Sequence, residues 1–102
     1  MNTDTSIAQT ILQQMGGTGR ISAMTGAKQF IALPNGVTFR IGRGANKSIN
    51  LVKVTLNGLD LYDVTFSRFR NMKVKDVVTV NDVFNDQLKG VFERETGMFL
   101  SL

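Results

Sequence analysis

The feature that most constrains the fold is a series of short segments in which apolar and polar residues alternate. Such alternation is the pattern of β-strands with one buried face. Turn signals, Pro34-Asn35-Gly36 and Asn57-Gly58, separate some of the segments. Asn-Gly favours a two-residue hairpin, and Asn35-Gly36 predicts a type I′ turn. We therefore expect an antiparallel meander of four or five strands, which span about residues 30–33, 37–41, 50–56, 61–69 and 72–80.

A helix is expected before the meander. Its apolar residues recur at helical spacing, and three polar residues offer N-caps. Gly16-Gly17 ends the pattern, and the small residues from Gly16 to Gly26 predict a loop. The apolar stripe is Ile7, Ile11, Leu12 and Met15, and the N-cap candidates are Thr3, Asp4 and Thr5.

A second helix is expected after the meander, capped by Thr79 or Asn81 and ended by Gly97. Asp82 lies in its predicted first turn, where an acid suits the helix dipole. The tail Met98-Phe99-Leu100 is apolar enough to dock on the core. The predicted buried face consists of Val83, Phe84, Leu88, Val91 and Phe92.

Together these patterns predict one α+β domain over residues 1–102. It has an N-terminal helix, an antiparallel sheet of four to five strands and a C-terminal helix, with both helices on one face of the sheet. An exposed edge of such a sheet would allow a homodimer to form by strand pairing.

The composition excludes several kinds of chemistry. The chain has no cysteine and no histidine, which excludes disulfides, thiolate metal sites and catalysis that uses a histidine base. No two carboxylates converge in the predicted fold, so we expect neither an enzyme nor a bound cofactor or metal. The polar start and the short apolar runs predict a cytoplasmic protein that does not enter a membrane.

Two glycine-containing segments resemble anion-binding loops only weakly. Gly42–Ser48 ends in Lys-Ser, but its glycines do not have the spacing of a phosphate-binding loop. A basic turn is the better interpretation. The loop from Gly16 to Gly26, with Arg20, would allow an anion to bind backbone amides. We favour a plain connection there.

Charge is divided unevenly along the chain. Ten basic and two acidic residues lie between Arg20 and Lys75, whereas the segment from Asp76 onward contains five acids and two bases. A basic middle beside an acidic end indicates one surface suited to an anionic partner.

Strand alternation assigns four of these cations to an open sheet face, opposite the helices. Met72 and Val74 are expected to face the core, and Lys73 and Lys75 to face outward. Threonines and serines on the open face would add neutral hydrogen-bond donors for phosphates, and Phe69 would offer a stacking surface. The alternative is an ordinary solvated face. The candidate binding residues are Arg40, Lys53, Lys73 and Lys75 on the face, and Arg43, Lys47, Arg68, Phe69 and Arg70 at its edges.

The chain resembles small open reading frames of tailed phages and prophages, a group of unassigned function. The resemblance is carried by four segments, which are 11–17 (ILQQMGG), 23–28 (AMTGAK), 59–64 (LDLYDV) and 95–102 (ETGMFLSL). It implies a viral accessory protein and transfers no site residue.

Two functions are therefore expected. The first is a phage-encoded, non-enzymatic protein that binds nucleic acid, either DNA or RNA. The second is an inhibitor that binds an acidic host protein, such as a defence nuclease, in the manner of an anti-CRISPR protein.

Overall fold

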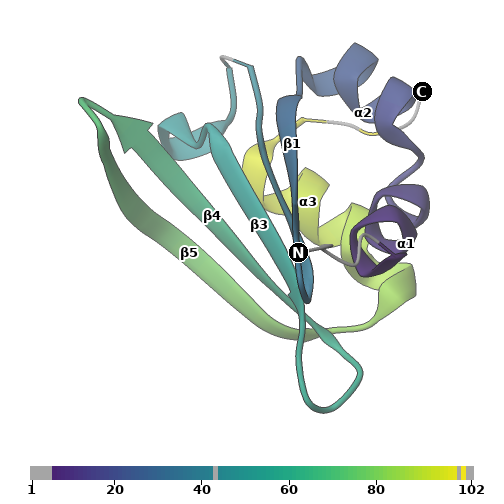
Figure 1. The fold of residues 1–102 in the computed structure, drawn as a ribbon. Helices are drawn as coiled ribbons and strands as arrows, with labels where there is room; N and C mark the ends of the chain where they lie inside the picture. The colour runs from purple at the N-terminus through teal and green to yellow at the C-terminus, as the bar shows by residue number, and fades with distance from the viewer. Residues whose placement is uncertain (1–5, 43, 99, 101–102) are drawn as a thin grey trace.

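Five antiparallel strands follow one another along the chain and pair in the order β1-β2-β3-β4-β5 (Figure 1). The computed structural model describes residues 6–42, 44–98 and 100. This α+β architecture is the predicted one, at the upper limit of the expected strand number. The strands are β1 Lys28–Leu33, β2 Gly36–Arg40, β3 Leu51–Leu56, β4 Tyr62–Arg70 and β5 Lys73–Val83.

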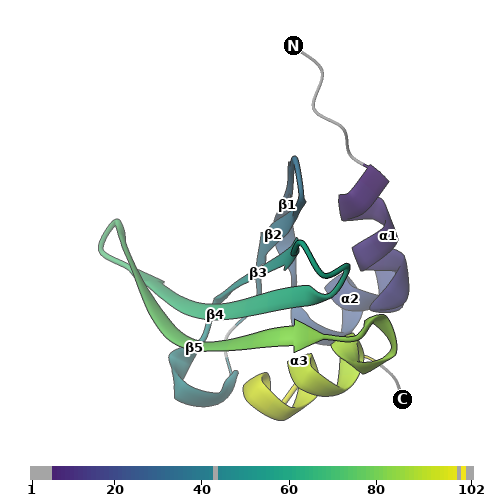
Figure 2. The ribbon, with the colours of Figure 1, turned by 90° about the horizontal axis from the view of Figure 1, so that it is seen from below.

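The helices cover one side of the curled sheet and leave the other side open (Figure 2). Two short 3-10 helices, η1 and η2, complete the fold. The predicted N-caps Thr3, Asp4 and Thr5 lie outside the described residues. The elements are α1 Ser6–Gln14, α2 Thr18–Thr25, η1 Asn46–Ser48, η2 Asn85–Gln87 and α3 Leu88–Thr96.

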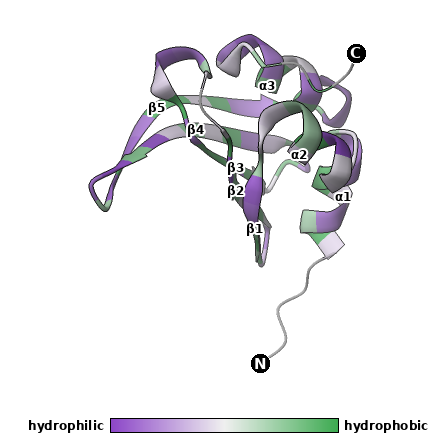
Figure 3. Ribbon diagram, turned by 90° about the horizontal axis from the view of Figure 1, so that it is seen from above, coloured by the Kyte–Doolittle hydropathy of each residue, from purple (hydrophilic) through white to green (hydrophobic). Residues whose placement is uncertain are grey.

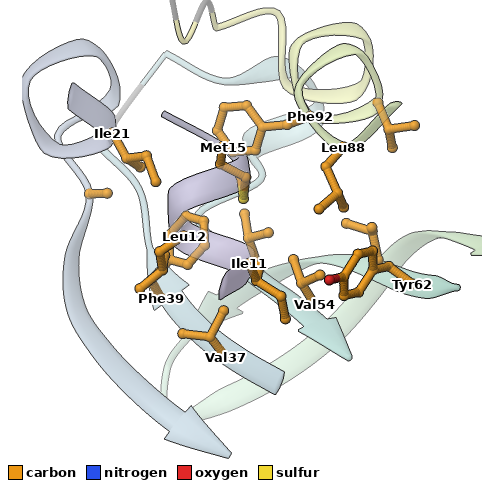
Figure 4. Close-up of a cluster of buried hydrophobic side chains, with 14 of the residues drawn as sticks. Ile11, Leu12, Met15, Ile21, Val37, Phe39, Val54, Tyr62, Leu88 and Phe92 are labelled. Carbon is orange, nitrogen blue, oxygen red and sulfur yellow. The ribbon is translucent and has the colours of Figure 1, made fainter. Parts of the chain in front are cut away.

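The core forms between α1, α3 and the inner face of the sheet (Figure 4). The ring of Phe92 lies 6.4 Å from Phe39 and 6.4 Å from Phe66, measured between centroids. Burying each such ring contributes about 1.5–3 kcal/mol. The predicted inward phase is correct for β2, β3 and most of β4, whose buried residues include Val37, Phe39, Val52, Val54, Tyr62, Val64 and Phe66.

The segment after α1 is a helix, so the prediction of a loop from Gly16 to Gly26 is wrong. Gly17 is the N-cap of α2, and Gly26 ends α2 in the left-handed region at φ 71°. Only Ile21 and Thr25 of this helix are buried. Two buried positions give no amphipathic pattern, and the glycines that suggested a loop mark the ends of the helix instead.

The first hairpin is present, but its turn is not the predicted type. Leu33 pairs with Gly36, so Pro34 and Asn35 form the turn. Neither Asn35 nor Gly36 has a positive φ, which excludes a type I′ turn at these residues. Gly36 is required for a different reason, since a Cβ there would lie 2.0 Å from the Val54 carbonyl oxygen.

The C-terminal helix begins later than predicted because β5 continues to Val83. Val83 pairs with Tyr62 and is buried as a strand residue. Asp82 therefore belongs to the sheet and not to a first helical turn. Phe84 is 54% exposed instead of buried, whereas Leu88, Val91 and Phe92 form the predicted buried face of α3.

The end of α3 agrees with the prediction. Gly97 is its C-cap in the left-handed region, at φ 73°. Leu100 is fully buried, and its backbone N–H donates to Glu93 Oε2 at 2.8 Å. The tail therefore docks on the core through Leu100, while Phe99 lies outside the described residues.

We predict that Gly36→Ala destabilises the protein by at least about 2 kcal/mol, because the added methyl overlaps main-chain atoms of β3. Urea unfolding measures the change. Gly58→Ala is the matched control, since a Cβ at Gly58 meets nothing within 4 Å. Equal unfolding midpoints for the two variants would contradict this account of Gly36.

Candidate nucleic-acid interface

The β4–β5 hairpin extends beyond the rest of the sheet as a two-stranded ribbon (Figures 1 and 2). The pairing of β4 with β3 ends at Ser67, whereas its pairing with β5 continues to Arg70 and Lys73. We call residues 68–75 the arm. Beyond Ser67 the arm therefore has no third strand beside it.

Hydrophobic and hydrophilic residues alternate along the arm (Figure 3). Residues directly opposite each other in an antiparallel pair point to the same side. Phe69 pairs with Val74, which places both on one side of the ribbon. Arg68 pairs with Lys75, and Arg70 pairs with Lys73. We call these four residues the basic side of the arm.

The basic side consists of two directly opposed pairs of like charges. Such pairs destabilise a sheet by about 0.2–1 kcal/mol each. Within the described part of the chain, the only ion pair within 4.0 Å is Arg94–Glu95. No described carboxylate therefore lies within 4.0 Å of the charged groups of the four arm cations.

An irregularity in β5 determines which residues join the basic side. Phe66 pairs with Val78 but Ser67 pairs with Asp76, which leaves Val77 without an opposite residue. The extra residue reverses the alternation of β5 beyond it. Ser67 Oγ donates to Asp76 Oδ1 at 2.8 Å, which confirms that these two side chains share a side.

This irregularity corrects the predicted orientation of the arm residues. Lys73 and Lys75 were expected on the open face with Arg40, but they lie on the opposite side of the ribbon from Phe69. Met72 and Val74 were expected to face the core, but they are 87% and 54% exposed. The candidate cations therefore do not form a single open-face patch.

Arg68 also connects the arm to η1. Its Nε and Nη2 donate to the Lys47 carbonyl oxygen at 3.2 and 2.7 Å. Lys47 has φ 57°, a left-handed conformation that is uncommon for a lysine. These two bonds bring the main chain of η1 beside the basic side of the arm.

Arg40 and Lys53 remain on the open face, as predicted. The guanidinium carbon of Arg40 lies 5.0 Å from the centroid of the Phe69 ring. Phe69 thus faces outward, with a cation already over its ring. Lys53 pairs with Thr38 and with Thr65, so no charge lies directly opposite it. Arg43 lies outside the described residues.

A cavity of about 790 Å³ opens at the end of the sheet beside the arm. Lys28, Arg40 and Arg70 line it together with Ser48 and Asn50, and none of the described lining residues is acidic. Lys28 was not predicted as a site residue. Its place beside the cavity follows from strand pairing, because Lys28 pairs with Arg40 across β1 and β2.

Asn50 supports this cavity and the base of the arm. Its Nδ2 donates to the Phe69 carbonyl oxygen at 2.9 Å. The Phe69 N–H donates to Asn50 Oδ1 at 2.7 Å. The side chain thus makes two hydrogen bonds to the main chain of β4, just beyond Leu51, the first residue of β3.

Acidic residues gather at the opposite end of the β4–β5 ribbon. Asn57 Nδ2 donates to Asp63 Oδ1 at 3.1 Å and to Asp82 Oδ1 at 2.8 Å. The sequence did not predict this pairing, because the irregularity that turns Asp82 toward Asp63 is not visible in the residue pattern. The ribbon therefore has an acidic end and a basic end.

The described residues include no group of three or more Asp or Glu side chains placed to hold a metal ion. Burial raises the pKa of the Tyr62 phenol, which lies in the core away from the arm.

Within the described part of the chain, no helix has the length and apolar character that spanning a membrane requires. The arm is a cationic surface in the part of the chain that the structure describes.

Comparisons of the chain with protein-family models, with curated proteins and with solved structures found no match.

We predict that Lys75→Glu stabilises the fold by about 0.5–1 kcal/mol at low salt, because it replaces repulsion from Arg68 with attraction. The gain should shrink as salt screens the pair. Lys53→Glu is the matched control: it changes the net charge equally but has only threonines opposite it. Denaturant unfolding at low and high salt measures both. An equal gain for the two variants would mean that net charge, not the opposed pair, causes the effect.

Proposed function

We propose that this is a small non-enzymatic binding protein that contacts nucleic acid through the basic side of the arm. The observation that carries the proposal is the arrangement of Arg68, Arg70, Lys73 and Lys75 in two directly opposed, unneutralised pairs. The arrangement costs stability in the free protein. A polyanion that binds there replaces the repulsion with attraction.

The geometry of the arm suits a phosphate backbone. Its four cations lie on one side of a narrow ribbon that projects from the body (Figure 2). Residues two apart on a strand are about 6–7 Å apart, and opposite residues are about 5 Å apart. Four charges at this spacing can contact several phosphates together, and the release of condensed counterions then drives binding.

The charge distribution also favours one orientation of the partner. Asp63 and Asp82 lie at the far end of the same ribbon, where they would repel phosphates. The cavity lined by Lys28, Arg40 and Arg70 extends the cationic surface from the base of the arm. We therefore place the nucleic acid along the arm and across this cavity, away from the loop between β3 and β4.

This proposal moves the interface from the open sheet face to the arm. Arg40 and Arg70 contribute through the cavity, and Lys53 falls outside the interface. The expected origin in a phage or mobile element is a separate hypothesis, and the proposed binding does not depend on it.

We predict that the protein binds short labelled DNA, and that affinity falls steeply between about 50 and 200 mM salt. The double variant Lys73→Gln/Lys75→Gln should weaken binding and make the slope of log affinity against log salt shallower by up to about 2, since each lost phosphate contact on duplex DNA removes about 0.9. Fluorescence anisotropy titrations at several salt concentrations measure both quantities.

The control is a variant with two cations removed elsewhere, Lys53→Gln/Lys89→Gln, which has the same net charge. We expect it to keep the salt dependence of the original protein. If this control loses affinity and the arm variant does not, the arm is not the interface. If neither single-stranded nor duplex DNA nor RNA binds at low salt, nucleic-acid binding is wrong and an acidic protein partner becomes the better hypothesis.

A further inference from the structure

The tip of the arm carries an exposed methionine where a hairpin normally has a glycine. Asn71 and Met72 join the paired residues Arg70 and Lys73, and their φ angles are 54° and 63°. Positive φ at both positions of a two-residue turn favours Asn followed by Gly. Methionine in this left-handed conformation costs roughly 1–2 kcal/mol relative to glycine.

Packing does not explain this methionine. Met72 is 87% exposed, and it belongs neither to the buried core nor to the side chains packed against it. An exposed apolar residue held in an unfavourable conformation is an observation from which a functional hypothesis can start.

The charges beside Met72 distinguish it from Leu59, the other exposed apolar side chain in a turn of this ribbon. Leu59 is 70% exposed in the loop near Asp63 and Asp82, at the acidic end of the ribbon. Met72 follows Asn71 directly and lies between the opposed cations Arg70 and Lys73. An apolar tip flanked by cations is complementary to a polyanion with an apolar interior, which is the structure of stacked base pairs between two phosphate backbones.

The dimensions of a two-stranded ribbon match a groove of duplex DNA. Two-stranded ribbons fit the major groove, and some proteins use strands in the minor groove. Proteins that bend DNA from the minor groove insert apolar side chains, including methionine, between base steps. The flexible, polarisable thioether adapts its shape to such a gap.

We infer that the partner of the arm is duplex DNA and that Met72 is a wedge that inserts between two base steps and bends the duplex. This inference rests on the proposed function and names its substrate class. The cations of the basic side hold phosphates beside the kink. The energy that unstacking requires comes from these contacts and from burial of the methionine side chain.

The test is Met72→Gly, studied with a DNA duplex that carries a fluorophore at each end. The original protein should raise energy transfer between the ends, because a wedge kinks DNA by about 20–90°. Met72→Gly should lose most of this rise. Its salt slope should be unchanged, since no charge has been removed, and its thermal stability should be equal or higher, since glycine relieves the left-handed strain. Stability and bending therefore change in opposite directions, which a merely structural methionine would not produce.

Two further variants make the result specific. Met72→Leu keeps an apolar side chain at the tip and should keep most of the bending. Leu59→Gly removes another strongly exposed apolar residue, from the loop at the other end of the ribbon, and this variant should bend DNA normally. A flexible TA step at the centre of the duplex should strengthen binding several-fold because it is easily unstacked, and Met72→Gly should lose this preference.

The outcomes separate this inference from the proposed function. If Met72→Gly bends DNA as well as the original protein while the arm charge variant loses affinity, the wedge is wrong and the arm interface stands. Binding to single strands only would also overturn the wedge. If neither variant differs from the original protein, both the wedge and the arm interface are wrong.

Discussion

The pairing of β4 with β5 determines what each side of this molecule presents. Two irregularities divide the ladder into three parts, one near Asp82 and one at Val77. The first brings Val83 into the core and turns Asp82 outward toward Asn57. The second places the four cations of the arm on one side of the ribbon and Phe69 and Val74 on the other. A ladder without these extra residues would not place the four cations of the arm on one side of the ribbon.

The same irregularities explain what the sequence could and could not predict. Alternation has a period of two, and it correctly assigned residues such as Phe39, Val54 and Phe66 to the core. One unpaired residue reverses the phase for every position beyond it. Nothing in the pattern around Val77 marks that residue as extra, because three valines lie close together at Val77, Val78 and Val80. The predicted faces of Lys73, Val74 and Lys75 were therefore wrong, although the strand itself was predicted.

The helices show a different limit of prediction from hydrophobic periodicity. Periodicity revealed α1 and the buried face of α3, because Ile11, Leu12, Leu88 and Phe92 are core residues at helical spacing. It missed α2, which is held by few buried side chains and is bounded by glycines at both ends. The identities of the candidate cations were available from the sequence, but their grouping was not. Grouping depends on register, and register is a property of two strands together.

The side chain of Asn50 has a consequence for how the arm behaves in solution. A two-stranded ribbon without further support is marginally stable and twists easily. The two hydrogen bonds between Asn50 and Phe69 act as one more rung of the sheet at the point where the third strand is missing. These bonds shorten the part of the β4–β5 ribbon that can move independently of the sheet. The Arg40 guanidinium contacts the ring of the same residue, Phe69, on the open face. The charges near the tip are thereby held on a stiffened ribbon, so fixing them in place would cost the arm little further conformational entropy.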